Sequence, residues 1–71
     1  MDHTPGTLLV LGRAASPQFV QPIRLRLVRA APAVTCDGWV WVDGYQLDQA
    51  GRAVERRTVF VRIAGVRLVR G

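Results

Sequence analysis

The segment from Gly38 to Gly65, GWVWVDGYQLDQAGRAVERRTVFVRIAG, constrains the fold of this chain more than any other segment. Two runs of β-branched and aromatic residues flank the sequence Asp48-Gln49-Ala50-Gly51. Aspartate at the first position and glycine at the fourth position favour a type I turn in a three-residue hairpin loop, with Gly51 in the left-handed conformation. The segment is therefore predicted to fold back on itself as one long β-hairpin.

This turn also predicts the register of the two strands. In that register the numbers of paired residues sum to 100, which places Trp41 opposite Val59 and Asp43 opposite Arg57. Aromatic against β-branched and acid against base are favourable cross-strand pairs. A slip by one residue, which sets Asp43 against Thr58, is electrostatically less coherent. We therefore prefer the first register.

Both faces of such a hairpin are partly apolar. One face is predicted to enter the core, and it carries Trp39, Trp41, Val59, Val61 and Ile63. The opposite face carries Val40, Val42, Val54, Thr58 and Phe60, with Arg56 and Arg62 at its margins. A single sheet buries only one of these faces against itself. The second face must be covered by closure into a barrel, by a second copy of the chain, or by a ligand.

The rest of the chain contains further short strands. Residues 7–14 form an apolar run, residues 23–29 (IRLRLVR) alternate with the period of a half-buried strand, and residues 66–70 form a short last strand. Residues 30–37 are expected to form a loop, and Gly44 indicates a bulge or a packed ring more than close approach of a ligand. The chain is predicted to be an all-β single domain over residues 7–71, after a flexible tail over residues 1–6. Four to five antiparallel strands in meander order favour a small barrel or roll of the SH3-like or OB-like kind.

Composition narrows the classes of function. The 71 residues include one Cys and one His, which excludes an intrachain disulfide and offers no metal cluster. No apolar run approaches the roughly 18 residues of a membrane span, and the N-terminus does not resemble a signal peptide. We therefore expect a cytoplasmic protein without a metal, a cofactor or a membrane partner.

Catalytic chemistry is not expected. A nucleophile needs a base beside it, but His3 lies in the predicted tail, Ser16 in a predicted turn, and Cys36 in a loop next to Asp37. Asp43 is assigned to a structural ion pair. We therefore predict a binding module and not an enzyme.

Two kinds of partner fit this prediction. The leading hypothesis is a protein-interaction or assembly domain, most simply a homodimer, whose interface is formed by Val40, Val42, Val54 and Phe60. The alternative is nucleic acid, because the net charge is +5 and all ten basic residues are Arg, whose planar fork binds phosphate. A GC-rich genome also explains the absence of Lys, but it does not explain the excess of positive charge. The residues predicted to bind nucleic acid or another anion are Arg24, Arg26, Arg56, Arg62 and Arg67, with Tyr45 and Phe60 stacking on bases.

Overall fold

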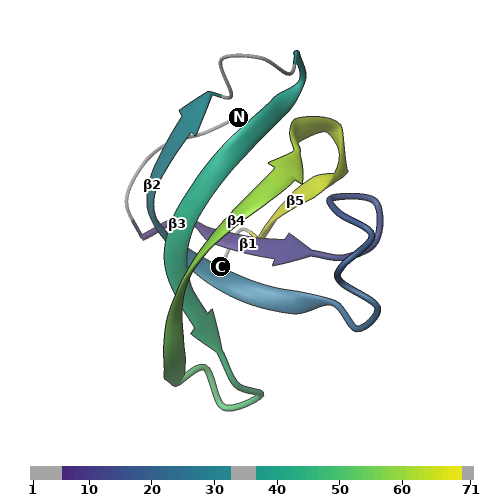
Figure 1. Cartoon of the computed structure of the whole chain (residues 1–71). Coiled ribbons are helices and arrows are strands. Elements are labelled where there is room, and N and C mark those ends of the chain that lie inside the picture. Colours follow the sequence, from purple (N-terminus) through teal and green to yellow (C-terminus); the bar gives the residue numbers. More distant parts are fainter. Residues whose placement is uncertain (1–5, 33–36, 70–71) are drawn as a thin grey trace.

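The chain folds as one antiparallel sheet of five strands (Figure 1). The structure is a computed structural model that describes residues 6–32 and 37–69. The strands are β1 (Leu8–Leu11), β2 (Ile23–Pro32), β3 (Trp39–Leu47), β4 (Ala53–Arg62) and β5 (Val66–Val69), and a 3-10 turn, η1 (Ile63–Gly65), joins β4 to β5. The strand order is β4-β3-β2-β1-β5. The predicted small all-β domain is therefore confirmed, but β4 and β5 form the two edges, so the sheet is not closed into a barrel.

The strand limits differ in part from those expected. The first strand is shorter than residues 7–14, and β2 continues three residues beyond residue 29. Residues 30–32 pair with β3 and do not belong to a loop, because their backbone hydrogen-bonding partners lie in the first half of β3. His3 and Cys36 lie outside the described residues.

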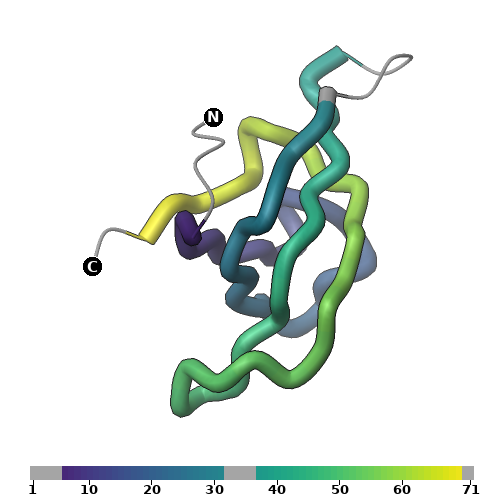
Figure 2. The backbone as a smooth tube through the Cα atoms, turned by 90° about the vertical axis from the view of Figure 1, so that its left-hand side faces the viewer, coloured from purple at the N-terminus to yellow at the C-terminus, as the bar shows by residue number. Residues whose placement is uncertain are grey.

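A bulge bends β2 and lets the sheet curl. Leu27 lies opposite Gly44 and Arg29 opposite Asp43, so Val28 is an extra residue in β2. Bulges of this kind bend a strand and increase its twist. Figures 1 and 2 show the result: β2, β3 and β4 form a long curved ribbon, and β1 and β5 cross behind it.

The core lies between this ribbon and the strands behind it. It is almost entirely aliphatic, and its buried members are Leu9, Leu11, Ala15, Phe19, Leu25, Leu27, Val40, Val42, Val59 and Val61. Ala15 and Phe19 come from the connection between β1 and β2, which is held against the sheet by a 2.7 Å hydrogen bond from the Arg62 amide to the Ala15 carbonyl. Phe19 is the one aromatic residue of the chain in this core.

The predicted turn of the central hairpin is confirmed. The Asp48 amide donates to the Arg52 carbonyl at 2.8 Å, and the Gly51 amide donates to the Asp48 carbonyl at 3.0 Å. The Asp48 Oδ1 atom accepts from the amides of Ala50 and Arg52, both at 2.9 Å. Gly51 has a φ of 85°, the left-handed conformation that glycine adopts without a steric cost.

The predicted register, however, is wrong beyond the first pair. Leu47 lies opposite Ala53, but the next pair is Gln46 with Glu55, so Val54 is an extra residue in β4. From there on every residue of β4 is shifted by one against β3. Because side chains alternate between faces along a strand, a shift of one residue reverses which side chains of β3 share a face with Val59 and Val61.

The shift decides which side chains reach the core. Val40 and Val42 point inward together with Val59 and Val61, whereas Trp41 lies opposite Phe60 on the outer side. The expectation that the two Trp side chains fill the core is therefore wrong. The physical reason is the small interior: four aliphatic pairs from four strands, together with Ala15 and Phe19, already fill the space between the two halves of the curled sheet.

Gly44 is needed because β2 and β3 approach closely. A Cβ atom at this position would lie 3.0 Å from the Leu25 Cγ and far inside contact distance of the Arg26 carbonyl oxygen. Gly44 is itself in register with Leu27, and the bulge lies across from it in β2. Gly44 is therefore needed because the backbone of β2 lies close to it. It does not make room for an aromatic ring or a ligand.

Candidate functional site

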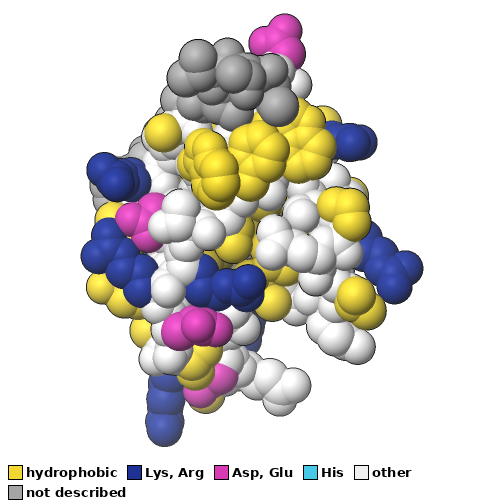
Figure 3. Space-filling view, in the orientation of Figure 1, with side chains coloured by type: hydrophobic (Ala, Val, Ile, Leu, Met, Phe, Trp, Pro, Cys, Tyr) yellow, Lys and Arg dark blue, Asp and Glu magenta, His cyan; other side chains and the backbone are white. Residues whose placement is uncertain are grey.

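Four of the five aromatic residues of the chain lie outside the core, on the outward side of the β2–β3–β4 ribbon. The Trp39 and Phe60 rings are stacked, with centroids 4.9 Å apart and planes 16° apart. The Trp41 ring lies 4.8 Å from Phe60 at 42°, and Trp41 is 48% exposed. Figure 3 shows hydrophobic side chains gathered over β3 and β4, with Arg side chains on either side. We call this outward side of β2, β3 and β4 the aromatic face.

Residues paired across β2, β3 and β4 form rows on the aromatic face, and these rows contain Arg side chains as well as aromatic rings. Successive rows are Ala31–Trp41–Phe60, Arg29–Asp43–Thr58 and Arg26–Tyr45–Arg56. At the upper end the Arg62 guanidinium lies 5.3 Å from the Trp39 ring centroid, and further down Arg56 lies 5.9 Å from the Tyr45 ring. Both distances suit cation–π attraction. The face therefore alternates stacked rings with positive charge.

Asp43 is the acidic member of this face, and its charge is neutralised within the chain. Arg56 donates to it in a fork, from Nε to Oδ1 at 3.1 Å and from Nη2 to Oδ2 at 2.7 Å. Arg29 Nε lies 3.7 Å from Oδ2. The hydrogen bonds from Arg56 hold the pKa of Asp43 below its usual range, although partial burial opposes this shift. With two Arg side chains on one carboxylate, this part of the face keeps a net positive charge.

The partner of Asp43 differs from the one expected. Arg57 lies on the inner side, where it donates to the Gln46 Oε1 atom at 2.9 Å and lies 5.7 Å from the Phe19 ring centroid. Arg56 replaces it because the one-residue shift places Asp43 on the same outer side as Arg56, which lies diagonal to it. The predicted structural ion pair at Asp43 is thus present, but its partner is Arg56 and not Arg57.

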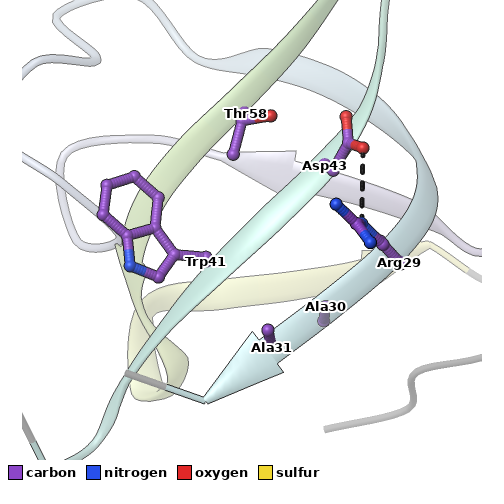
Figure 4. Close-up of a pocket in the computed structure, with 6 residues that line it drawn as sticks. All are labelled: Arg29, Ala30, Ala31, Trp41, Asp43 and Thr58. Atoms are coloured by element: carbon purple, nitrogen blue, oxygen red, sulfur yellow. Dashed lines mark ion pairs between the residues drawn. The ribbon is translucent and has the colours of Figure 1, made fainter. Parts of the chain in front are cut away.

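A pocket opens between the upper two rows of the face. Its volume is about 340 Å³, and it is lined by Arg29, Ala30, Ala31, Trp41, Asp43 and Thr58. Figure 4 shows the Trp41 ring on one side of the pocket and Asp43 with Arg29 on the other. The small side chains of Ala30 and Ala31 leave room beside the indole. A planar group stacked on Trp41 would meet a carboxylate, a hydroxyl and a guanidinium.

The structure brings together most of the residues predicted to bind an anion. Arg26, Arg56, Arg62, Tyr45 and Phe60 all lie on the aromatic face. The two remaining Arg residues do not join them. Arg24 donates to the Asp48 carbonyl at 2.6 Å and so fastens the hairpin turn to β2, and Arg67 lies on β5 beyond β1.

Sequence reasoning missed other members of the site, namely Trp39, Trp41, Arg29 and Thr58. The adjacent Arg56-Arg57 pair is a signal that the register was open, because either Arg is able to meet Asp43. The Trp residues were assigned to the core, and Arg29 was placed next to a predicted loop whose first residues, 30–32, are strand.

The predicted protein interface is not assembled. Val40 and Val42 belong to the core and are 1% and 0% exposed, so they do not line a free apolar face. The reason is again the shift in β4, which brings Val59 and Val61 over them. Val54 is exposed, but it lies at the bulge near the turn, at the opposite end of β4 from Phe60.

Residues 6–32 and 37–69 contain no group of three or more His, Cys, Asp or Glu side chains suited to hold a metal ion. Within the same residues no helix has the length and apolar character needed to cross a membrane. Comparison of the chain with protein families, with curated proteins and with solved structures found no match.

Proposed function

We propose that the protein binds single-stranded nucleic acid through the aromatic face. The observation that carries this proposal is the half-exposed Trp41, packed at a tilt against Phe60 in a ring cluster that the core does not need. Every base has a π face, so exposed aromatic side chains on a sheet bind unpaired bases without requiring a particular sequence. Bases within a duplex are already stacked, which is why such a surface favours single strands.

The charges of the same face support this proposal. Arg26, Arg29 and Arg62 lie in different rows around the rings, at positions where they would meet successive phosphates. Asp43 does not oppose them, because Arg56 holds its carboxylate in a fork. The whole chain carries a net charge of +5, which attracts a polyanion over a longer range.

The finer fold assignment is part of the proposal. We infer an SH3-like roll, since β1 to β4 are sequential neighbours and β5 returns beside β1. An OB-like barrel is a Greek-key arrangement, and this strand order does not support it. Fold alone does not determine function, so the ligand is argued from the aromatic face.

Fluorescence polarisation with a labelled single-stranded decamer tests the proposed function. If three phosphates are bound, the logarithm of affinity falls with the logarithm of salt at a slope of about −2, a loss of about 20-fold between 50 and 200 mM salt. Trp41→Ala removes one stacking platform and should weaken binding by about 1–3 kcal/mol, or about 5- to 150-fold. Leu68→Ala is the matched control, because Leu68 is a similarly exposed apolar residue on β5. Absence of binding at 50 mM salt would refute the proposal.

A second candidate is assembly of two copies of the chain through the same aromatic face. Its support is the exposed apolar surface on a small domain, since large surface patches of this kind mark contacts with partners. The exposed large side chains of this face include Trp41 and Tyr45, and Trp39 and Phe60 pack beside Trp41. Sedimentation at high micromolar concentration should then show a dimer that Trp41→Ala converts to a monomer. A monomer at all concentrations would exclude this candidate and leave nucleic-acid binding in place.

A further inference from the structure

We infer that the aromatic face binds two bases that are separated by one nucleotide, one base on Trp41 and the other on Tyr45. The single strand then runs extended along β3, which carries both rings. The inference rests on the proposed function, because it divides the same face into subsites. It adds a rule for the spacing of the bound bases, which stacking on a ring does not by itself impose.

Two of the four outward rings offer a base an exposed surface, Trp41 at 48% and Tyr45 at 38%. The other two rings are partly covered by their neighbours. Trp39 and Phe60 are stacked on each other, and the Arg62 guanidinium lies 5.3 Å from the Trp39 ring centroid. A base that stacks needs ring surface that other side chains leave open, so we call Trp41 and Tyr45 the two platforms.

The first platform, Trp41, borders the pocket. The methyl groups of Ala30 and Ala31 line the pocket beside the indole and leave room there (Figure 4). The volume of about 340 Å³ is at the lower end of the range for small-ligand pockets, roughly 300–1,000 Å³. Phe60 packs against the indole at a tilt, with ring centroids 4.8 Å apart, and limits its movement. The pocket therefore has space for one base against a fixed ring.

The second platform, Tyr45, lies in a basic row. Its partners across the sheet are Arg26 on β2 and Arg56 on β4. The Arg56 guanidinium lies 5.9 Å from the ring centroid, and the Arg26 side chain is exposed. Arg donates two parallel hydrogen bonds to a phosphate. This row therefore offers a ring to a base and an exposed guanidinium to its phosphate.

The distance between the two platforms sets the spacing of the bases. Trp41 and Tyr45 are four residues apart on β3, and a strand rises about 3.3 Å per residue, which places them about 13 Å apart. Neighbouring bases in a duplex strand are 3.4 Å apart, and an extended step covers no more than roughly 7 Å, about twice that rise. Two adjacent bases that both face the sheet therefore do not reach both rings. Two extended steps are the shortest connection that does.

The row between the platforms has no ring for the middle base. Asp43 and Thr58 occupy this row, and Arg56 already holds both carboxylate oxygens of Asp43. Arg29 lies at the end of the row on β2, with a side chain that is 80% exposed and 3.7 Å from Asp43 Oδ2. The middle nucleotide thus finds a guanidinium for its phosphate and no platform for its base.

Three abasic octamers test the spacing by fluorescence polarisation at 50 mM salt with the complete, unaltered chain. One octamer carries a single adenine, one carries two adjacent adenines, and one carries two adenines with one abasic nucleotide between them. The separated pair should bind about 5- to 150-fold more tightly than the single adenine, the contribution of one further base on an aromatic ring. The adjacent pair should bind close to the single adenine. Because only the separation of the bases differs between the two pairs, sliding of the strand does not affect the comparison.

Two variants then assign the second platform. Tyr45→Leu keeps an apolar side chain but removes the ring, so it should abolish the gain from the separated pair and leave binding of the single adenine nearly unchanged. Leu68→Ala, at an exposed position of β5, should keep the gain. If octa-adenylate binds, equal affinity for the three abasic octamers, or a full gain with adjacent adenines, would refute the spacing and leave the proposed function standing. Failure of octa-adenylate itself to bind would refute both.

Discussion

Gly44→Ala tests the close approach of β2 and β3, on which the aromatic face depends. The new Cβ would lie 3.0 Å from the Leu25 Cγ and much closer to the Arg26 carbonyl oxygen. Ordinary contacts between carbon and oxygen need about 3.3 Å or more, so the two strands must separate at this point. Overpacking of this kind costs about 1–3 kcal/mol, and one weakened ladder hydrogen bond adds about 1 kcal/mol. We expect a loss of about 2–4 kcal/mol in the free energy of unfolding.

Thermal unfolding followed by circular dichroism measures this loss. For a domain of this size it corresponds to a decrease of roughly 10 to 30 °C in Tm. Gly12→Ala is the matched control, because a Cβ there meets the Pro22 Cγ at an ordinary 3.7 Å and the backbone φ is not positive. That variant should be unchanged or more stable by up to about 1 kcal/mol, since Ala restricts the unfolded chain. Equal Tm values for Gly44→Ala and the unaltered protein would refute the strand packing described above.

Three further predictions concern the hairpin. Val42→Ala removes buried methyl groups and should lower the free energy of unfolding, measured by urea denaturation, by about 2–3 kcal/mol. Val54→Ala, at an exposed bulge, should change it by less than about 0.5 kcal/mol. Equal losses for the two variants would contradict the observed faces of the hairpin. Gly51→Ala forces a Cβ into the left-handed region and should cost about 1–2 kcal/mol in the same assay, and an unchanged stability would contradict the turn. Because the pKa of Asp43 is lowered in the folded state, its pairing with Arg56 stabilises the fold above the usual carboxyl pKa, and this stabilisation is lost as pH falls through the lowered value. Acid titration of Asp43→Asn should therefore show a weaker dependence of stability on pH below about 4, and an identical profile would contradict the ion pair.

The hairpin and its turn were predictable because their causes are local. Asp48 and Gly51 occupy the positions that the turn requires, and both form the expected hydrogen bonds. Alternation in residues 23–29 likewise predicted the inward Leu25 and Leu27, which are buried. Such signals depend on neighbouring residues along the chain, which a sequence displays directly.

The register of β4 was not predictable from the pairing rules used. Those rules favoured Asp43 opposite Arg57, but the diagonal neighbour Arg56 satisfies the same carboxylate in the observed register. Cross-strand charge therefore does not distinguish the two registers when two Arg residues are adjacent. The deciding feature is the extra residue Val54, and a bulge of this kind has no strong local signature in a run of β-forming residues.

The error in the register also led to a wrong prediction of which residues form the site. With β4 shifted, the Trp residues moved from the predicted core to the surface, and Val40 and Val42 moved from the predicted interface to the core. Arg26, Arg56 and Arg62 kept their predicted outward positions, because Leu25, Leu27, Val59 and Val61 point inward in either register. The positive charge of this face was thus predictable from the sequence. The presence of Trp39 and Trp41 on it was not predictable and is seen only in the structure.

The most direct test of the aromatic face is a nuclear magnetic resonance titration of the two indole N–H signals with a single-stranded heptamer. The account predicts that both the Trp39 and the Trp41 signals shift in proportion to bound oligonucleotide, while the amide of the buried core residue Leu9 stays in place. Indole signals that remain unchanged at saturating oligonucleotide, whether or not other residues respond, would contradict the claim that the aromatic face binds single-stranded nucleic acid.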